Sequence, residues 1–148
     1  MKKILNIILI LIFFAFLYNL VDMMFKRQKE GGLKEITTGG NILEQLKKES
    51  ANPILLLFGE KDDEETEKMI KILKELKLDY KSRLDINFVD VKKNQDVRKK
   101  YNIIKLPTLY VINTQGKVIR RIVGLTQKER IRFILKEAGL RKKWNPLE

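Results

Sequence analysis

The sequence contains neither cysteine nor histidine. Without them the chain has no thiolate nucleophile, no imidazole acid or base, and none of the usual ligands of structural zinc or iron–sulfur clusters. We therefore expect no cofactor and no metal ion. Any thiol exchange in which the protein takes part must use the sulfur of another protein, so catalysis of that kind is not expected from the chain itself.

The composition is that of one folded domain with an appendage. Of the 148 residues, 34% are charged and 44% are apolar, a balance typical of globular rather than disordered chains. Single domains most often contain about 100 to 150 residues. The length therefore allows one domain and one short additional segment.

Residues 1–25 predict a transmembrane anchor. Two lysines precede residues 4–21, a run of 18 residues interrupted by only two asparagines. As a helix this run would span about 27 Å, enough to cross the apolar part of a bilayer. The following residues, 22–27, contain no small-residue cleavage site of the kind that ends a signal peptide. An uncleaved anchor is thus favoured over a cleaved signal peptide or a buried soluble helix.

The orientation of this anchor is only weakly specified. Positive charges lie on both sides of the apolar run, at Lys2 and Lys3 before it and at Lys26, Arg27 and Lys29 after it. The positive-inside rule therefore barely discriminates. Because a short N-terminal tail commonly stays inside, we expect a single-pass membrane protein whose folded domain lies outside the cytoplasm.

The rest of the chain divides into a linker, a domain and a tail. Residues 26–40 contain two Gly-Gly pairs and predict a flexible linker, within which residues 33–37 have the pattern of a short edge strand. Residues 41–140 are expected to form the domain. Residues 141–148 form a basic tail that includes the only tryptophan.

The first half of the domain has the pattern of an α/β unit. Asn41 is positioned to cap a helix that ends before Pro53, and residues 54–58 are continuously apolar, as in a strand covered on both faces. Apolar residues at helical spacing follow, and residues 85–91 form a second strand candidate. A strand-helix-strand order predicts parallel pairing through a right-handed crossover.

The second half predicts a short helix, a β-hairpin and a closing helix. The helix is expected around residues 95–101 and the hairpin strands at residues 108–112 and 117–123. In the last strand Arg120 is expected to share a face with Val118 and Ile122, which places that strand at an edge of the sheet.

The closing helix follows the hairpin. Thr126 is expected to cap this helix at its start, and Gly139 is expected to end it. Between them, apolar residues recur at helical spacing and predict one buried face.

This order of elements and several motifs resemble the thioredoxin superfamily. Residues 101–109 read Tyr-Asn-Ile-Ile-Lys-Leu-Pro-Thr-Leu, followed by Gly116 in the hairpin and Gly124 before the last helix. Phe58 ends the apolar strand at the family's spacing. The resemblance, which covers residues 53–140, implies a mixed α/β sheet of the thioredoxin-like fold.

The resemblance also implies a lost redox centre. The family's C-x-x-C motif falls on Asp63-Glu64-Glu65-Thr66, or, with a gap of one residue, on Glu64 and Glu67. The buried acid of the family falls on Leu57. These replacements imply a thioredoxin-like domain that performs no redox chemistry.

The same resemblance gives candidates for peptide binding. In thioredoxins the proline that corresponds to Pro107 has a cis peptide bond, and the backbone of the preceding residue pairs with an extended peptide. Lys105, Leu106 and Pro107 are therefore the peptide-binding candidates. Without the resemblance, a trans proline opening an edge strand remains the alternative.

Charge is distributed unevenly and leaves alternatives open. Six acids at residues 60–67 are explained by the start of a helix, by a docking patch for a basic partner, or by a cation site; a calcium-type loop motif is absent. Residues 92–148 hold 16 Lys or Arg against 4 Asp or Glu, which predicts a solvated basic surface or attraction to anionic lipid. Nucleic-acid binding is not expected, because no recognition motif is present.

Three classes of function follow. The first is a membrane-anchored module that binds or scaffolds a protein or peptide. The second is an accessory component of an envelope thiol-disulfide oxidoreductase system, in which a partner supplies the cysteines. The third is an enzyme of other chemistry built on carboxylates and lysines near Asp63 and Lys105.

Overall fold

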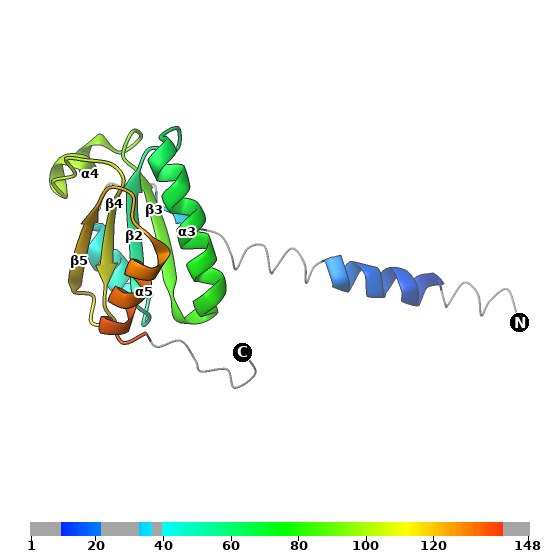
Figure 1. Ribbon diagram of the computed structural model, residues 1–148. Helices are drawn as coiled ribbons and strands as arrows, with labels where there is room; N and C mark the ends of the chain where they lie inside the picture. The colour runs from blue at the N-terminus through cyan, green and yellow to red at the C-terminus, as the bar shows by residue number, and fades with distance from the viewer. Residues whose placement is uncertain (1–9, 22–32, 37–39, 141–148) are drawn as a thin grey trace, which may run out of the picture. The chain divides into compact units, whose positions relative to one another are not determined.

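The computed structural model describes residues 10–21, 33–36 and 40–140. The chain divides into two compact units, residues 1–32 and 33–148. In the first unit residues 10–21 form a helix (Figure 1). Its large apolar side chains are exposed. In the described parts of the chain, no helix combines the length and apolar character needed to cross a bilayer. The remainder of the predicted anchor, most of the linker and the basic tail lie outside the described residues.

The second unit is built on one mixed sheet with strand order β1-β3-β2-β4-β5. Strands β1, β3 and β2 are parallel, whereas β4 pairs antiparallel with both β2 and β5. The strands are β1 (Lys34–Glu35), β2 (Ile54–Gly59), β3 (Asp85–Asp90), β4 (Thr108–Ile112) and β5 (Val118–Val123). The predicted α/β architecture and the edge positions of the first and last strands are confirmed. The sheet begins within the segment predicted as linker.

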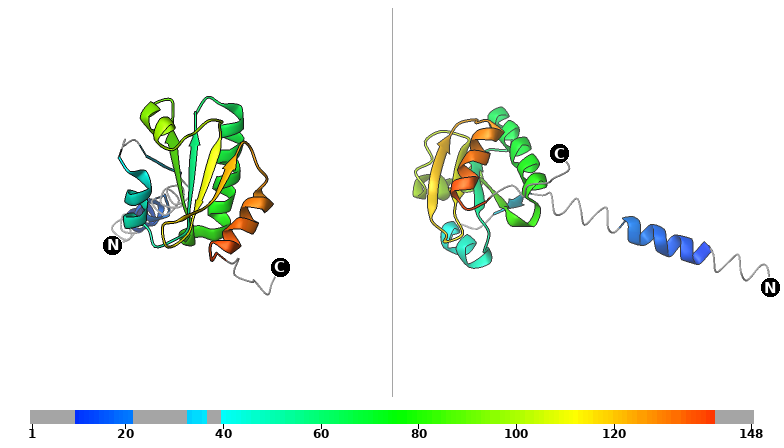
Figure 2. Two further views of the ribbon diagram at one scale, coloured as in Figure 1. Left: turned by 90° about the vertical axis from the view of Figure 1, so that its left-hand side faces the viewer. Right: turned by 60° about the horizontal axis from the view of Figure 1, so that its bottom comes forward.

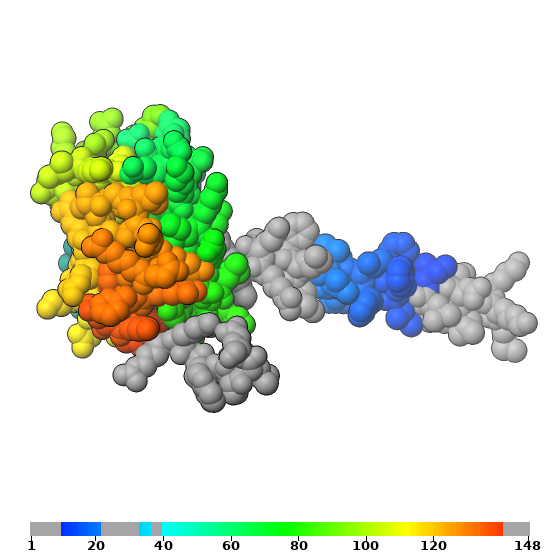
Figure 3. All heavy atoms as spheres, in the orientation of Figure 1, coloured from blue at the N-terminus to red at the C-terminus, as the bar shows by residue number. Residues whose placement is uncertain are grey.

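Helices cover both faces of this sheet (Figure 2). Helices α3 and α5 pack on one face with Leu55 and Leu57 of β2, while α2 and α4 contribute to a second cluster with Leu56 and Phe58 on the other face. Figure 3 shows α3 and α5 in direct contact on the first face. The helices are α2 (Ile42–Glu49), α3 (Glu64–Tyr80), the 3-10 turn η1 (Lys81–Arg83), α4 (Gln95–Lys100) and α5 (Lys128–Glu137).

Strand β2 is buried along its whole length. Parallel β3 and antiparallel β4 flank it, so both its backbone edges are paired and both its side-chain faces are covered. This arrangement confirms the prediction drawn from the continuous apolar run. Burial of one apolar side chain of this size stabilises the fold by about 1.5–3 kcal/mol. The side chains of β2 therefore contribute a large part of the core's stability.

Strand β5 departs from the prediction in its facing pattern. A register shift between Val111 and Ile112 places Val118 opposite Ile112, whereas Arg120 lies opposite Val111. The expectation that Val118 shares a face with Arg120 and Ile122 is therefore wrong, because a β-bulge reverses the alternation of side chains beyond it. Arg120 faces α5 and forms an ion pair with Glu137 at 3.0 Å.

Helix α5 begins one residue later than predicted. Its N-cap is Gln127, which makes no side-chain capping bond, and Thr126 is buried before the helix, so the predicted threonine cap is wrong. The predicted end at Gly139 is confirmed. Gly139 has φ +93° and donates to the carbonyl of Lys136, while Leu140 donates to that of Leu135. This pair of bonds satisfies the last carbonyls of the helix.

Candidate functional site

Helix α3 starts directly after Asp63, whose carboxylate acts as the N-cap. It accepts hydrogen bonds from the backbone N–H of Thr66 at 2.8 Å and from the Thr66 hydroxyl at 2.7 Å. Thr66 is fully buried, whereas Glu64 and Glu65 are exposed. A carboxylate at this position also interacts favourably with the helix dipole. Of the residues expected at the degenerate redox motif, Asp63 therefore caps the helix and Thr66 is packed in the interior.

The end of β2 lies against this helix start. A Cβ added to Gly59 would lie 2.4 Å from the Cγ2 atom of Thr66, so only glycine fits there. Phe58, the preceding residue, pairs with Thr108 of β4, which follows Pro107. Through these contacts the structure brings the start of α3 and the Pro107 segment to the same end of the sheet.

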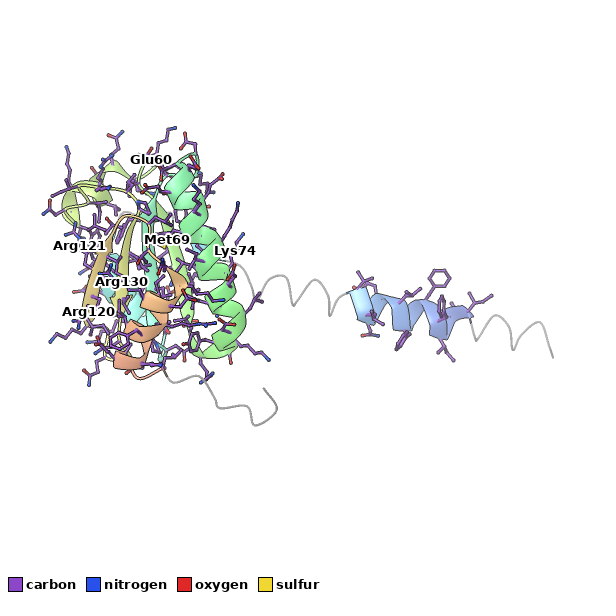
Figure 4. All side chains as sticks on the ribbon, viewed as in Figure 1. Glu60, Met69, Lys74, Arg120, Arg121 and Arg130 are labelled. Atoms are coloured by element: carbon purple, nitrogen blue, oxygen red, sulfur yellow. The ribbon has the colours of Figure 1, made fainter. Side chains whose placement is uncertain are left out.

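The acids that surround the helix start have cationic partners. Lys92 pairs with Asp62 at 2.6 Å and Lys68 pairs with Glu64 at 2.6 Å, and these hydrogen bonds lower the pKa of each carboxyl. Glu60, labelled in Figure 4, lies 3.6 Å from the guanidinium of Arg98. Among the described residues, no three acidic side chains converge as metal ligands would. Helix-start electrostatics and local ion pairs thus account for most of the acidic cluster.

The second group of predicted residues forms the turn into β4. The Leu106–Pro107 peptide bond is cis. The carbonyl of Pro107 accepts a hydrogen bond from Gly124 at 2.7 Å, and the carbonyl of Lys105 accepts one from the Thr108 hydroxyl at 2.6 Å. Within the described part of the chain, the backbone N–H and C=O of Leu106 make no hydrogen bond.

Apolar side chains are exposed around this turn. Ile104 is 76% exposed and Leu125 is 42% exposed, while Leu106 is half-buried. Pro107 itself is buried beneath them, and we call Ile104, Leu106 and Leu125 the cis-proline surface. Residue patterns alone did not single out Ile104 or Leu125, because consecutive isoleucines in an irregular segment carry no periodicity that says which one is buried.

Three aromatic rings support the segment that leads to this surface. Phe58 lies between Tyr101 and Tyr110, with ring centroids 5.4 and 5.1 Å away. The hydroxyl of Tyr110 donates to the carbonyl of Tyr101 at 3.0 Å. Aromatic pairs at these separations are favourable, so the trio holds the segment between α4 and β4 against the sheet.

The sheet order, the crossover and the cis proline at this position define a thioredoxin-like fold. The chain belongs to the family described as a thioredoxin-like domain, which matches residues 27–128.

Known thioredoxins are similar to this chain over part of its length. Thioredoxins of Staphylococcus aureus strains Mu50 / ATCC 700699 and MW2 are each 36% identical over 64 residues, which cover 43% of this chain and 61% of the thioredoxin. The crystal structure of chloroplastic thioredoxin z superposes with a TM-score of 0.65 at 20% identity, covering 72% of this chain and 94% of that protein. At 20% identity, the similarity to thioredoxin z shows a shared fold alone.

Proposed function

We propose that this protein is a membrane-anchored thioredoxin-like module that lacks redox-active cysteines and binds an extended polypeptide at the cis-proline surface. The observation that carries this proposal is the backbone of Leu106, which makes no hydrogen bond to any described residue and lies next to the exposed side chains of Ile104 and Leu125. The absence of cysteine excludes a dithiol reaction within the chain.

The geometry of the turn suits recognition by backbone pairing. An extended peptide beside Leu106 would satisfy the free N–H and C=O groups, which is how added strands gain much of their affinity. Its alternate side chains would contact Ile104 and Leu125, and contacts of this kind give specificity. Lys105 is exposed next to these residues and can contact polar groups of the same peptide.

The capped helix start fits a binding role rather than a catalytic one. In the proposed correspondence, Asp63 and Thr66 occupy the two redox positions and Glu64 and Glu65 lie between them. The carboxylate of Asp63 is engaged by Thr66. The Asp63 carboxylate and the buried Thr66 hydroxyl stabilise the helix start. Neither group contains sulfur, so neither can exchange a disulfide.

A membrane location is supported by the apolar helix of the first unit. The described residues 10–21 expose many large apolar side chains, among them Leu11, Phe14 and Phe16. A helix that is apolar on all sides needs an apolar environment. We therefore propose that residues 1–25 anchor the protein in a bilayer, with the folded domain on the extracytoplasmic side.

Site-specific crosslinking in cells tests the binding role. A photoreactive residue at Leu106 should label a polypeptide, whereas the same probe at Leu78, which is 67% exposed on α3, should not give that product. Labelling of lipid and water alone at Leu106 would contradict the proposal. If the labelled polypeptide carries a reactive cysteine pair, the accessory role in a thiol-disulfide system gains support.

Two further assays test the other parts of the proposal. Alkaline carbonate extraction should leave the full chain with the membrane and release a variant that lacks residues 1–25.

Purified protein should give no dithiol-driven reduction of insulin above the rate without protein. Turnover in that assay would contradict a redox-inactive domain.

A further inference from the structure

A long segment of the domain carries no negative side chain. Residues 97–128 contain eight Lys or Arg and no Asp or Glu. The segment includes most of α4, the Pro107 turn, β4 and β5. All residues of the cis-proline surface therefore lie in a segment whose only charged side chains are positive.

Some of these cations are neutralised by acids from other elements. Arg98 contacts Glu60, Arg120 contacts Glu137, and Lys128 contacts two acids of α3. In contrast, five cations have no carboxylate within ion-pair distance among the described residues: Lys99, Lys100, Lys105, Lys117 and Arg121. Lys117 lies in the hairpin turn between β4 and β5; we call the other four residues the basic flank.

The basic flank lies along the segment that leads to Pro107. The ammonium of Lys105 is 3.9 Å from the position of a Cβ on Gly124, the residue that donates to the Pro107 carbonyl. Arg121 donates to the carbonyl of Asn102 at 2.6 Å. These contacts place two positive charges where residues 102–107 meet β5, and Figure 4 shows Arg121 on the β5 side of the sheet.

Neutral partners orient two of these cations. The guanidinium of Arg121 lies 5.7 Å from the centre of the Tyr110 ring, and the ammonium of Lys100 lies 5.9 Å from that of Tyr101. Aromatic rings and carbonyl groups attract a cation without removing its charge. The cations are thus positioned while their charge stays uncompensated.

We propose that the polypeptide bound at the cis-proline surface is acidic, with Asp or Glu side chains paired to Lys105 and Arg121 while its backbone pairs with Leu106. This inference rests on the proposed peptide-binding function and adds the chemistry of the partner. At the start of α3, Asp62 and Glu64 are paired with Lys92 and Lys68, whereas Lys105 and Arg121 beside the turn have no carboxylate partner among the described residues.

A peptide explains more of the surface than a lipid headgroup does. An anionic headgroup could pair with Lys105 and Arg121, but it has no N–H and C=O groups in strand spacing for Leu106. An extended acidic peptide provides both kinds of partner. Anionic vesicles therefore belong in the test as a competing ligand.

Fluorescence anisotropy on the full chain in phosphatidylcholine nanodiscs provides the test. Three labelled peptides of equal length alternate valine with glutamate, serine or lysine. The glutamate peptide should bind about tenfold more tightly than the serine peptide, and this preference should shrink as salt is added, because screening weakens exposed charge pairs. The lysine peptide should bind most weakly.

Substitutions test whether Lys105 and Arg121 cause the preference for the glutamate peptide. Lys105→Gln and Arg121→Gln should each reduce the glutamate-peptide affinity several-fold and leave the serine peptide nearly unchanged. Lys71→Gln and Lys74→Gln remove exposed cations of α3 and serve as matched controls that should change neither. Unchanged far-ultraviolet circular dichroism shows that each variant is folded.

The outcomes separate this inference from the proposed function. Equal binding of all three peptides would overturn the acidic preference and leave peptide binding intact. Failure of every peptide to bind would contradict the proposed function itself. Binding of phosphatidylglycerol vesicles that depends on Lys105 and Arg121 and displaces the glutamate peptide would assign the basic flank to lipid instead.

Discussion

The carboxylate of Asp63 accepts two hydrogen bonds from Thr66, one from the backbone N–H at 2.8 Å and one from the hydroxyl at 2.7 Å. The two residues are three positions apart, so the pair spans the first turn of α3. The carboxylate lies at the position where the helix dipole favours an anion. The helix start of this thioredoxin-like domain is thus a stabilising element of the fold.

Replacement of this cap should weaken the domain. Asp63→Ala removes the acceptor of both bonds and should lower the free energy of unfolding by about 1 kcal/mol, the usual effect of losing a helix N-cap. Urea denaturation followed by circular dichroism measures the change. Glu65→Ala, which removes an exposed acid from the same turn, should have a smaller effect. Equal losses in the two variants would show that the cap is unimportant.

Gly59 is predicted to tolerate no side chain while Thr66 is present. Gly59→Ala places a Cβ 2.4 Å from the Thr66 Cγ2 atom and should destabilise the domain by about 1–3 kcal/mol, as overpacking does. In the Thr66→Ala background the same substitution should cost clearly less, because the opposing methyl group is gone. A double-mutant cycle measures this coupling. Strict additivity of the two substitutions would refute the close contact.

Introduced cysteines test which residues occupy the family's redox positions. Asp63→Cys combined with Thr66→Cys should form an intramolecular disulfide on oxidation, because the two native side chains are in contact. The thiol at position 63 should have a pKa below its usual value of about 8.5, since it lies at a helix N-terminus.

The second possible alignment provides the comparison. Glu64→Cys combined with Glu67→Cys places both thiols on the exposed side of α3. Alkylation rates measured across pH report the thiol pKa values, and mass spectrometry reports the disulfide. A faster disulfide and a lower thiol pKa in this second pair would favour the shifted alignment.

The ion pairs between α3 and α5 should make the stability of the domain depend on pH. Asp79 contacts Arg132 and lies 3.1 Å from the ammonium of Lys128. Burial opposes its ionisation, but hydrogen bonds from Arg132 and Lys128 outweigh that effect and lower the pKa of Asp79. Its stabilising contribution is therefore present above the unfolded pKa of about 3.9 and is lost as the pH falls through the lower folded value.

Asp79→Asn removes this contribution. At neutral pH the substitution should reduce the free energy of unfolding by up to about 1 kcal/mol, since the pair is partly exposed. The difference from the native protein should narrow as the pH drops below about 3.9. Glu75→Gln is the matched control, because Glu75 is 60% exposed and contacts only Lys128 of the two cations. A pH-independent effect of Asp79→Asn would contradict the role of its charge.

Local sequence patterns were sufficient for the repetitive parts of the fold. The apolar run in β2 is confirmed by its burial. The helical pattern of α3 rested on Met69, Ile72, Leu73 and Leu76, of which Ile72 is partly buried and the other three are fully buried. The patterns failed where one residue shifts the alternation, as at Val118, or where two adjacent residues are chemically alike. Ile103 is buried and Ile104 is exposed, yet nothing local distinguishes them.

The sequence by itself determined the order of the elements, the lack of thiol chemistry and the excess of positive charge after residue 91. These properties depend on residue type and on spacing along the chain. Among the described residues, the tertiary structure decided which cations lack a carboxylate partner, which backbone groups of Leu106 make no hydrogen bond, and that Gly59 lies against Thr66. Such contacts depend on strand register and on packing between distant segments, which the amino-acid order encodes only through the fold.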